Sequence, residues 1–112
     1  MVIIVADVIR TLAFGGISGS YAVVGTPVSH NWRMFRITNN TNGDLLFSLD
    51  GTNDNFFVPA SSFVLYDIST NAPPISESDN FQLGRNTQFY VKQSTVPTAG
   101  AVWIEGIYAK GD

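Results

Sequence analysis

The hydrophobic residues of this chain recur with period two in short runs, and clusters of glycine, asparagine, proline and serine separate these runs. Such alternation is typical of half-buried β-strands, and runs spaced about 8–12 residues apart indicate an antiparallel sandwich or small barrel. No window repeats apolar residues at i, i+3, i+4 and i+7 beyond one helical turn. The pattern therefore restricts the chain to an all-β fold.

Eight or nine strands account for the alternating runs. A chain of 112 residues has the usual size of one domain, so we expect residues 1–112 to form a single antiparallel β-sandwich. A count near eight favours a jelly-roll-like topology. The runs that we expect to be strands are residues 7–14, 21–24, 32–38, 44–49, 56–58, 63–68, 81–83, 88–93 and 101–109.

Composition excludes several classes of partner. Charged residues make up 13% of the chain, the net charge is −3, and the six Lys and Arg residues are scattered. A nucleic-acid partner is not expected, because phosphate binding needs clustered cations. The absence of cysteine excludes disulfides and thiolate chemistry. No apolar run approaches the roughly 20 residues that span a bilayer, so we expect a soluble protein without an export signal or a membrane partner.

Catalytic residue types occur without a catalytic arrangement. His30 is the one histidine, and we interpret it as a surface or packing residue. No serine has the glycine pattern of a nucleophile elbow. Most acids lie in turns, where they bond the local backbone, and only Asp67 and Glu105 fall inside strand runs. We therefore expect no enzyme activity and no cofactor.

Two loops carry motifs that a turn also explains. Residues 50–55 (DGTNDN) gather the oxygen donors that calcium prefers. Their spacing does not fit the twelve-residue calcium loop, so a hairpin turn is favoured and the calcium site stays an alternative. Asn39-Asn40-Thr41 matches a glycosylation sequon. It opens residues 39–43 (NNTNG), the strongest turn pattern in the chain, because Asn and Gly tolerate positive φ.

The N-terminal apolar segment has two interpretations. Val2, Ile3, Ile4 and Val5 are four consecutive β-formers ahead of the first alternating strand. They either extend that strand or belong to an arm, residues 1–6, that adds to the sheet edge of another subunit. We favour the interface, because a free arm of this kind promotes aggregation.

Trp103 is the second candidate interface residue. It lies on the strand face opposite Val102, Ile104 and Tyr108, and it shares its own face with Glu105. The alternation allows a half-buried position or an exposed interface anchor, and both alternatives stay open.

Several segments of the chain form a recognisable set of turn and strand motifs. They are residues 36–44 (RITNNTNGD), 47–51 (FSLDG), 57–68 (FVPASSFVLYDI), 91–92 (VK) and 97–100 (PTAG), with the C-terminal strand. Together these segments resemble a small jelly-roll virion protein of tailed bacteriophages, and the likeness covers roughly residues 8–109. The family carries no catalytic motif to transfer.

The resemblance implies a structural role without chemistry. It predicts a capsid decoration protein, of the cement or staple type, that binds the major capsid protein and stabilises the shell. Such a protein is made in the host cytoplasm, resides on the outer surface of the virion, and associates with itself as a dimer or trimer. The alternative is a tail, neck or head-fibre component whose β-sandwich binds a carbohydrate or receptor.

Overall fold

The computed structural model describes residues 3–67 and 83–110, and these residues form an all-β structure. One 3₁₀ turn, η1, is the sole helical element within the described residues. The elements are β1 (Ile4–Ala6), β2 (Arg10–Ala13), η1 (Phe14–Gly16), β3 (Ala22–Val23), β4 (Trp32–Thr41), β5 (Leu45–Ser48), β6 (Phe56–Val58), β7 (Ser62–Asp67), β8 (Tyr90–Gln93) and β9 (Gly100–Ala109).

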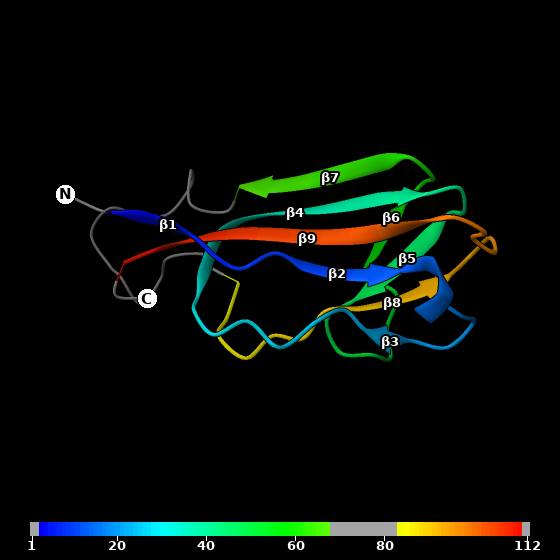
Figure 1. The fold of residues 1–112 in the computed structure, drawn as a ribbon. Coiled ribbons are helices and arrows are strands. Elements are labelled where there is room, and N and C mark those ends of the chain that lie inside the picture. The colour runs from blue at the N-terminus through cyan, green and yellow to red at the C-terminus, as the bar shows by residue number, and fades with distance from the viewer. Residues whose placement is uncertain (1–2, 68–82, 111–112) are drawn as a thin grey trace.

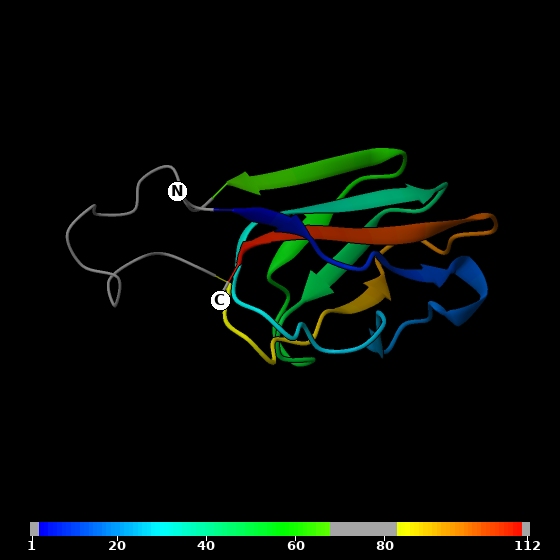
Figure 2. The ribbon, with the colours of Figure 1, turned by 60° about the vertical axis from the view of Figure 1, so that its left-hand side comes forward.

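The strands form two packed antiparallel sheets (Figures 1 and 2). The five-stranded sheet has the order β1-β9-β4-β7. β2 also pairs with β9, in line with β1 along the same edge. The four-stranded sheet has the order β3-β8-β5-β6. The predicted antiparallel β-sandwich is confirmed. Of the predicted strand at residues 81–83, the structure describes Leu83, which forms an isolated bridge with Trp32.

The strand pairing is nested. β5 pairs with β6, β4 with β7, β3 with β8 and β2 with β9. Two further pairings join these pairs into sheets. β4 pairs with β9, which joins the β4–β7 pair to the β2–β9 pair, and β5 pairs with β8, which joins the β5–β6 pair to the β3–β8 pair. The chain therefore runs as one long antiparallel hairpin that is wound into two layers.

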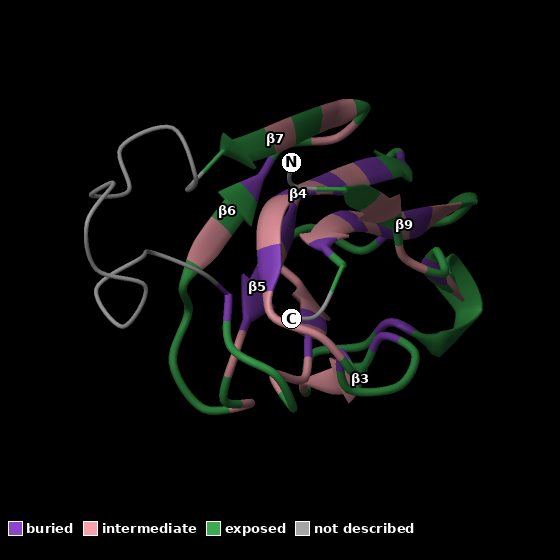
Figure 3. Cartoon of the chain, turned by 90° about the vertical axis from the view of Figure 1, so that its left-hand side faces the viewer, coloured by how far each residue is buried: buried purple, intermediate pink, exposed green. Residues whose placement is uncertain are grey.

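The hydrophobic core lies between the sheets, and burial alternates along β4 and β9 as period two requires (Figure 3). Both strands are ten residues long, and Phe35 and Ile37 of β4 and Val102 and Ile104 of β9 point to the core side of the sheet. The largest fully buried apolar side chains are Val24, Val28, Trp32, Ile37, Leu45, Phe47, Val58, Phe89, Val91, Val102 and Ile104.

A β-bulge changes the predicted face of Trp32. Strict alternation places Trp32 opposite Phe35, but the register between β4 and β9 shifts between Trp32 and Met34. The extra residue turns the Trp32 side chain inward, where it is fully buried and stacks 5.9 Å from the ring of Phe89. Gly106 makes this possible, because a Cβ at that position would lie 2.2 Å from the indole.

The strand predicted at residues 7–14 is shorter in the structure, where β2 covers Arg10–Ala13. The chain leaves the sheet after β1 and returns at Arg10, which is 7% exposed and donates hydrogen bonds to the carbonyls of Thr26 and Val8 at 2.7 and 2.8 Å. Asp7 lies 3.7 Å from the Arg10 guanidinium and accepts a 2.8 Å bond from the Trp32 indole. Burial of a charge is tolerated where it is paired and hydrogen-bonded, and here it ties β2 to the loop before β4.

The predicted turn at residues 39–43 begins three residues too early. β4 continues through Thr41, and Asn39 is a fully buried strand residue. Its amide donates to the carbonyls of Gly43 and Val58 at 2.8 and 2.9 Å, and its Oδ1 accepts the Thr41 N–H at 3.0 Å. Asn39 therefore joins the β4–β5 connection to the end of β6 through buried hydrogen bonds. Because its side chain is fully buried, the sequon leaves no room for a glycan.

Replacement of Gly106 by alanine is expected to destabilise the fold. The new methyl group overlaps the Trp32 ring, and overpacking of this kind costs about 1–3 kcal/mol. Urea unfolding followed by tryptophan fluorescence measures the loss. Gly15→Ala is the matched control, because nothing lies within 4 Å of a Cβ built there, and it should change stability by less than about 1 kcal/mol. Equal stabilities of the two variants would contradict this account of Trp32.

Candidate functional site

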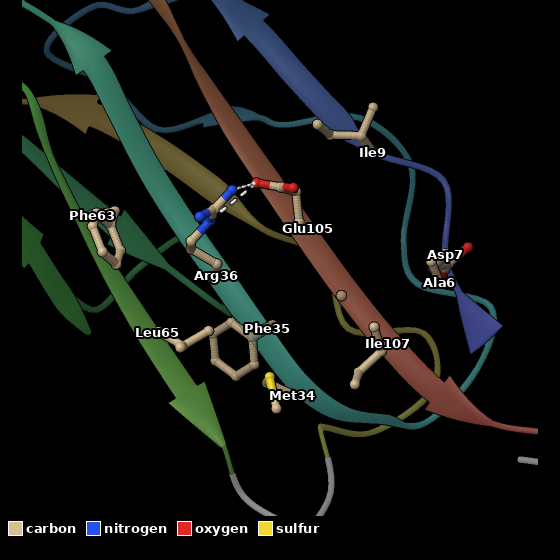
Figure 4. A pocket seen from close by; sticks show the side chains of 11 residues that line it. Ala6, Asp7, Ile9, Met34, Phe35, Arg36, Phe63, Leu65, Glu105 and Ile107 are labelled. Atoms are coloured by element: carbon tan, nitrogen blue, oxygen red, sulfur yellow. Dashed lines mark hydrogen bonds and ion pairs between the residues drawn. The ribbon is translucent and has the colours of Figure 1, made fainter. Parts of the chain in front are cut away.

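Exposed apolar side chains gather on the outer face of the five-stranded sheet, away from the core. They line a groove with a volume of about 440 Å³. Figure 4 shows side chains from β7, β4 and β9 on this face, with Ile9 on the far side of β9. We call this surface the apolar groove, and its central residues are Met34, Arg36, Phe63, Leu65, Glu105 and Ile107.

Strand register sets the order of side chains across the groove. Leu65 pairs with Arg36, which pairs in turn with Glu105. One row further along, Met34 pairs with Ile107. Because side chains that alternate along a strand share a face, these residues lie on the face opposite Phe35 and the rest of the core. The same strand pairing therefore forms the core on one face of the sheet and the groove on the other.

An ion pair lies at the centre of the groove. Arg36 Nη2 and Nε lie 2.6 and 3.1 Å from Oε1 of Glu105, and the Arg36 guanidinium sits 5.6 Å from the ring centre of Phe63. The two charged side chains are 43% and 41% exposed. An ion pair this exposed contributes at most about 1 kcal/mol to stability. The ion pair also fixes one positive and one negative charge within an otherwise largely apolar surface.

The predicted interface segment lies in the sheet of its own chain. Ile4 and Val5 in β1 pair with Ala109 and Tyr108, and the Ile3 carbonyl accepts a 2.7 Å bond from the Lys110 N–H. Val2 lies outside the described residues. Ile3 and Ile4 remain about half exposed. The segment therefore extends the sheet edge, and its role between subunits stays a prediction.

Trp103 is half-buried on the outer face, as one of the two alternatives for it required. It pairs with Thr11 on one side and Thr38 on the other, one row from Glu105. A partner on the apolar groove would therefore lie beside this indole, and its role as an interface anchor stays a prediction.

The residues 50–55 fold into a turn that uses its own carboxylate. Asp50 accepts bonds from the N–H groups of Asn53 and Thr52 and from the Ser48 hydroxyl, each at 2.8 or 2.9 Å. These bonds, led by the Asn53 N–H, hold the pKa of Asp50 well below its usual value. The oxygen atoms of the Asp50 carboxylate are thus already occupied by hydrogen bonds within the loop, which favours the hairpin interpretation over a calcium site. Within the described ranges, no group of three or more His, Asp or Glu residues is placed to hold a metal ion.

The carboxylate of Asp54, in the same loop, also has partners within the chain. It accepts a short hydrogen bond from the Tyr21 hydroxyl, and Lys92 Nζ lies 3.1 Å from its Oδ1. The bond to Tyr21 lowers the pKa of Asp54, while burial and that same bond raise the pKa of Tyr21. The loop is thereby tied to β8.

The other predicted catalytic candidates lie apart. His30 stacks on Tyr108 with ring centres 3.8 Å apart, which is a packing role. Glu105 pairs with Arg36, whereas Asp67 ends β7 in a different row, across β4 from Glu105. The structure does not join them into a carboxylate pair.

Sequence reasoning missed the apolar groove. The run at residues 63–68 did carry an indication, because both of its faces are apolar: Phe63 and Leu65 on one, Val64 and Tyr66 on the other. A strand with a second apolar face is typical of a surface that another group covers.

No protein family, curated protein or solved structure was found to match this chain. In the part of the chain that the structure describes, no helix is long and apolar enough to cross a bilayer.

Replacement of Asp50 by asparagine should weaken the fold at neutral pH and flatten its response to acid. The folded pKa of Asp50 lies below its ordinary value of 3.8. Its contribution to stability is therefore complete well above that value and is lost progressively as the pH falls from 3.8 toward the lower folded pKa. Urea unfolding at a series of pH values from neutral to about pH 2 measures both effects.

Asn53→Ala is the comparison for Asp50→Asn. It removes one side-chain donor, 2.7 Å from Asp50 Oδ2, but keeps the carboxylate and both backbone bonds. We expect this variant to retain most of the acid dependence. An Asp50→Asn protein as acid-sensitive as the wild type would refute the role assigned to this turn.

Proposed function

We propose that this chain is a structural protein of a bacteriophage virion that decorates the capsid, binds the major capsid protein shell and stabilises it without catalysing a reaction. The observation that carries the proposal is the apolar groove, an open, largely apolar surface on a folded sandwich. Exposed apolar patches of this kind mark sites of protein association. The proposal gives that surface a role in assembly.

The surface chemistry fits close packing of many copies. The whole chain has 13% charged residues and a net charge of only −3. Weakly charged neighbours repel one another little, which favours a dense layer on a shell. Four acidic residues, Asp7, Asp50, Asp54 and Glu105, accept hydrogen bonds or form ion pairs within the chain.

The nested strand pairing also supports the proposal. A long antiparallel hairpin that is wound into two layers is how a jelly roll is built, and viral capsid domains are common among such folds. We propose that this chain is a jelly roll of that type, with β1 as an additional N-terminal strand in line with β2 along the same edge of β9. Fold alone does not define function, so the proposal depends on the groove.

A decoration protein stabilises a shell by binding only its assembled form, so mass action shifts the equilibrium toward intact particles. Particles from which the protein is stripped by a mild chaotrope should therefore lose resistance to heat and osmotic shock. Adding back the purified full chain should restore it, with stripped particles in buffer alone as the control. Light scattering and genome release during heating measure both steps.

Copy number locates the protein in the same particles. A number comparable to that of the major capsid protein supports decoration of the shell. A few copies confined to one vertex would instead indicate a tail, neck or fibre component. Stripped particles that withstand heat as well as complete ones would overturn the stabilising role.

A further inference from the structure

We propose that the occupant of the apolar groove is a second copy of this chain, so that two sandwiches pack through the outer faces of their five-stranded sheets. The inference rests on the proposed assembly role and names the partner at that site. The two-fold axis runs parallel to the strands, in the plane of the interface, between β4 and β9. This axis places β4 over β9 of the second copy and β7 over its β1 and β2.

Charge complementarity points to a second copy. Arg36 and Glu105 are direct partners in register on the two strands that flank the axis. The two-fold operation therefore sets Arg36 over Glu105 of the second copy, and Glu105 over its Arg36. Both bonds within the chain end on Oε1 of Glu105, and Oε2 takes no part in this ion pair. A second guanidinium can bind there, and four charges then alternate in sign across the interface.

An uncharged partner is a poorer occupant. It would cover an ion pair whose members are 43% and 41% exposed and would remove their water without replacing its hydrogen bonds. Desolvation of an ion pair is costly unless new polar partners satisfy it. A copy of the same pair, turned by two-fold symmetry, supplies those partners.

The remaining rows also match under the same rotation. Met34, paired in register with Ile107, faces Ile107 of the second copy. Leu65 on β7 faces the segment between β1 and β2, where Ile9 lines the groove. Trp103, in register with Thr38, faces the smaller Thr38 of the second copy. Large side chains thus oppose small or apolar ones, as in sheets whose inner faces interdigitate.

The face is large enough for a stable dimer. Four strand positions about 4.8 Å apart and ten-residue strands about 33 Å long give a flat area on the order of 600 Å². Side-chain relief increases the accessible area beyond that flat figure. Stable interfaces bury about 800 Å² on each partner, which is of the same order.

The test is the molar mass of the purified full chain by analytical ultracentrifugation. The wild type should sediment at twice the chain mass of 12.2 kDa. Arg36→Glu and Glu105→Arg should each be monomeric, because each makes all four central charges alike in sign. Mixing the two variants should restore a dimer, since one then contributes two acids and the other two bases. A folding defect in either variant does not produce such a restored dimer.

Two edge-strand variants provide a matched control. Leu65 in β7 and Phe57 in β6 are 55% and 53% exposed, on different sheets. Leu65→Asp should weaken dimerisation at least about tenfold, whereas Phe57→Asp should leave it unchanged. Trp103 fluorescence gives a second readout: its emission should shift to the red on dilution, while the fully buried Trp32 contributes a constant background.

Three results would overturn the dimer: a wild-type chain that stays monomeric at millimolar concentration, a mixture of the charge variants that stays monomeric, or a Phe57→Asp loss equal to that of Leu65→Asp. If a monomeric chain still decorates and stabilises particles, the dimer is wrong and the proposed function stands. If the chain dimerises through this face but is absent from virions, the dimer stands and the proposed function fails.

Discussion

The pairing of β4 with β9 is the constraint on which the rest of the structure depends. Two ten-residue strands lie in register beside each other, and each sends alternate side chains to opposite faces. One face supplies Ile37 and Ile104 to the core, and the other supplies Arg36 and Glu105 to the groove. A slip of one residue would exchange the two faces, so the same register that forms the interior also creates the external surface.

Period two was sufficient to predict the fold class and most of the strands, because alternation is local information. It was insufficient where tertiary contacts override the local pattern. The inward turn of Trp32 depends on a bulge and on space beside Gly106, which lies 74 positions further along the chain. Alternation does not indicate that Arg10 is buried, because the carbonyl groups that surround it come close only in the folded chain. Asn39 was expected in a turn but is a buried strand residue, because its side chain bonds carbonyl groups of two other segments in the folded chain.

The apolar groove shows a different gap between sequence and structure. Each of its side chains lies on the face opposite the core residues of its own strand, as alternation along a strand requires. No periodicity reveals, however, that β7 and β9 both lie next to β4, since strand order follows from pairing between distant segments. Phe63 and Leu65 therefore read as isolated apolar positions in the sequence, and their proximity to Arg36 and Glu105 emerges only from the three-dimensional pairing.

An ion pair within an apolar surface also addresses the problem that such a surface creates. A purely apolar sheet face would pack against many partners in many registers, and exposed sheets are prone to aggregation. Arg36 and Glu105 penalise every register that sets like charges together or leaves a charge covered and unpaired. In the proposed dimer, one orientation about one axis avoids both penalties. The charges then contribute mainly specificity, while the apolar side chains around them contribute the affinity.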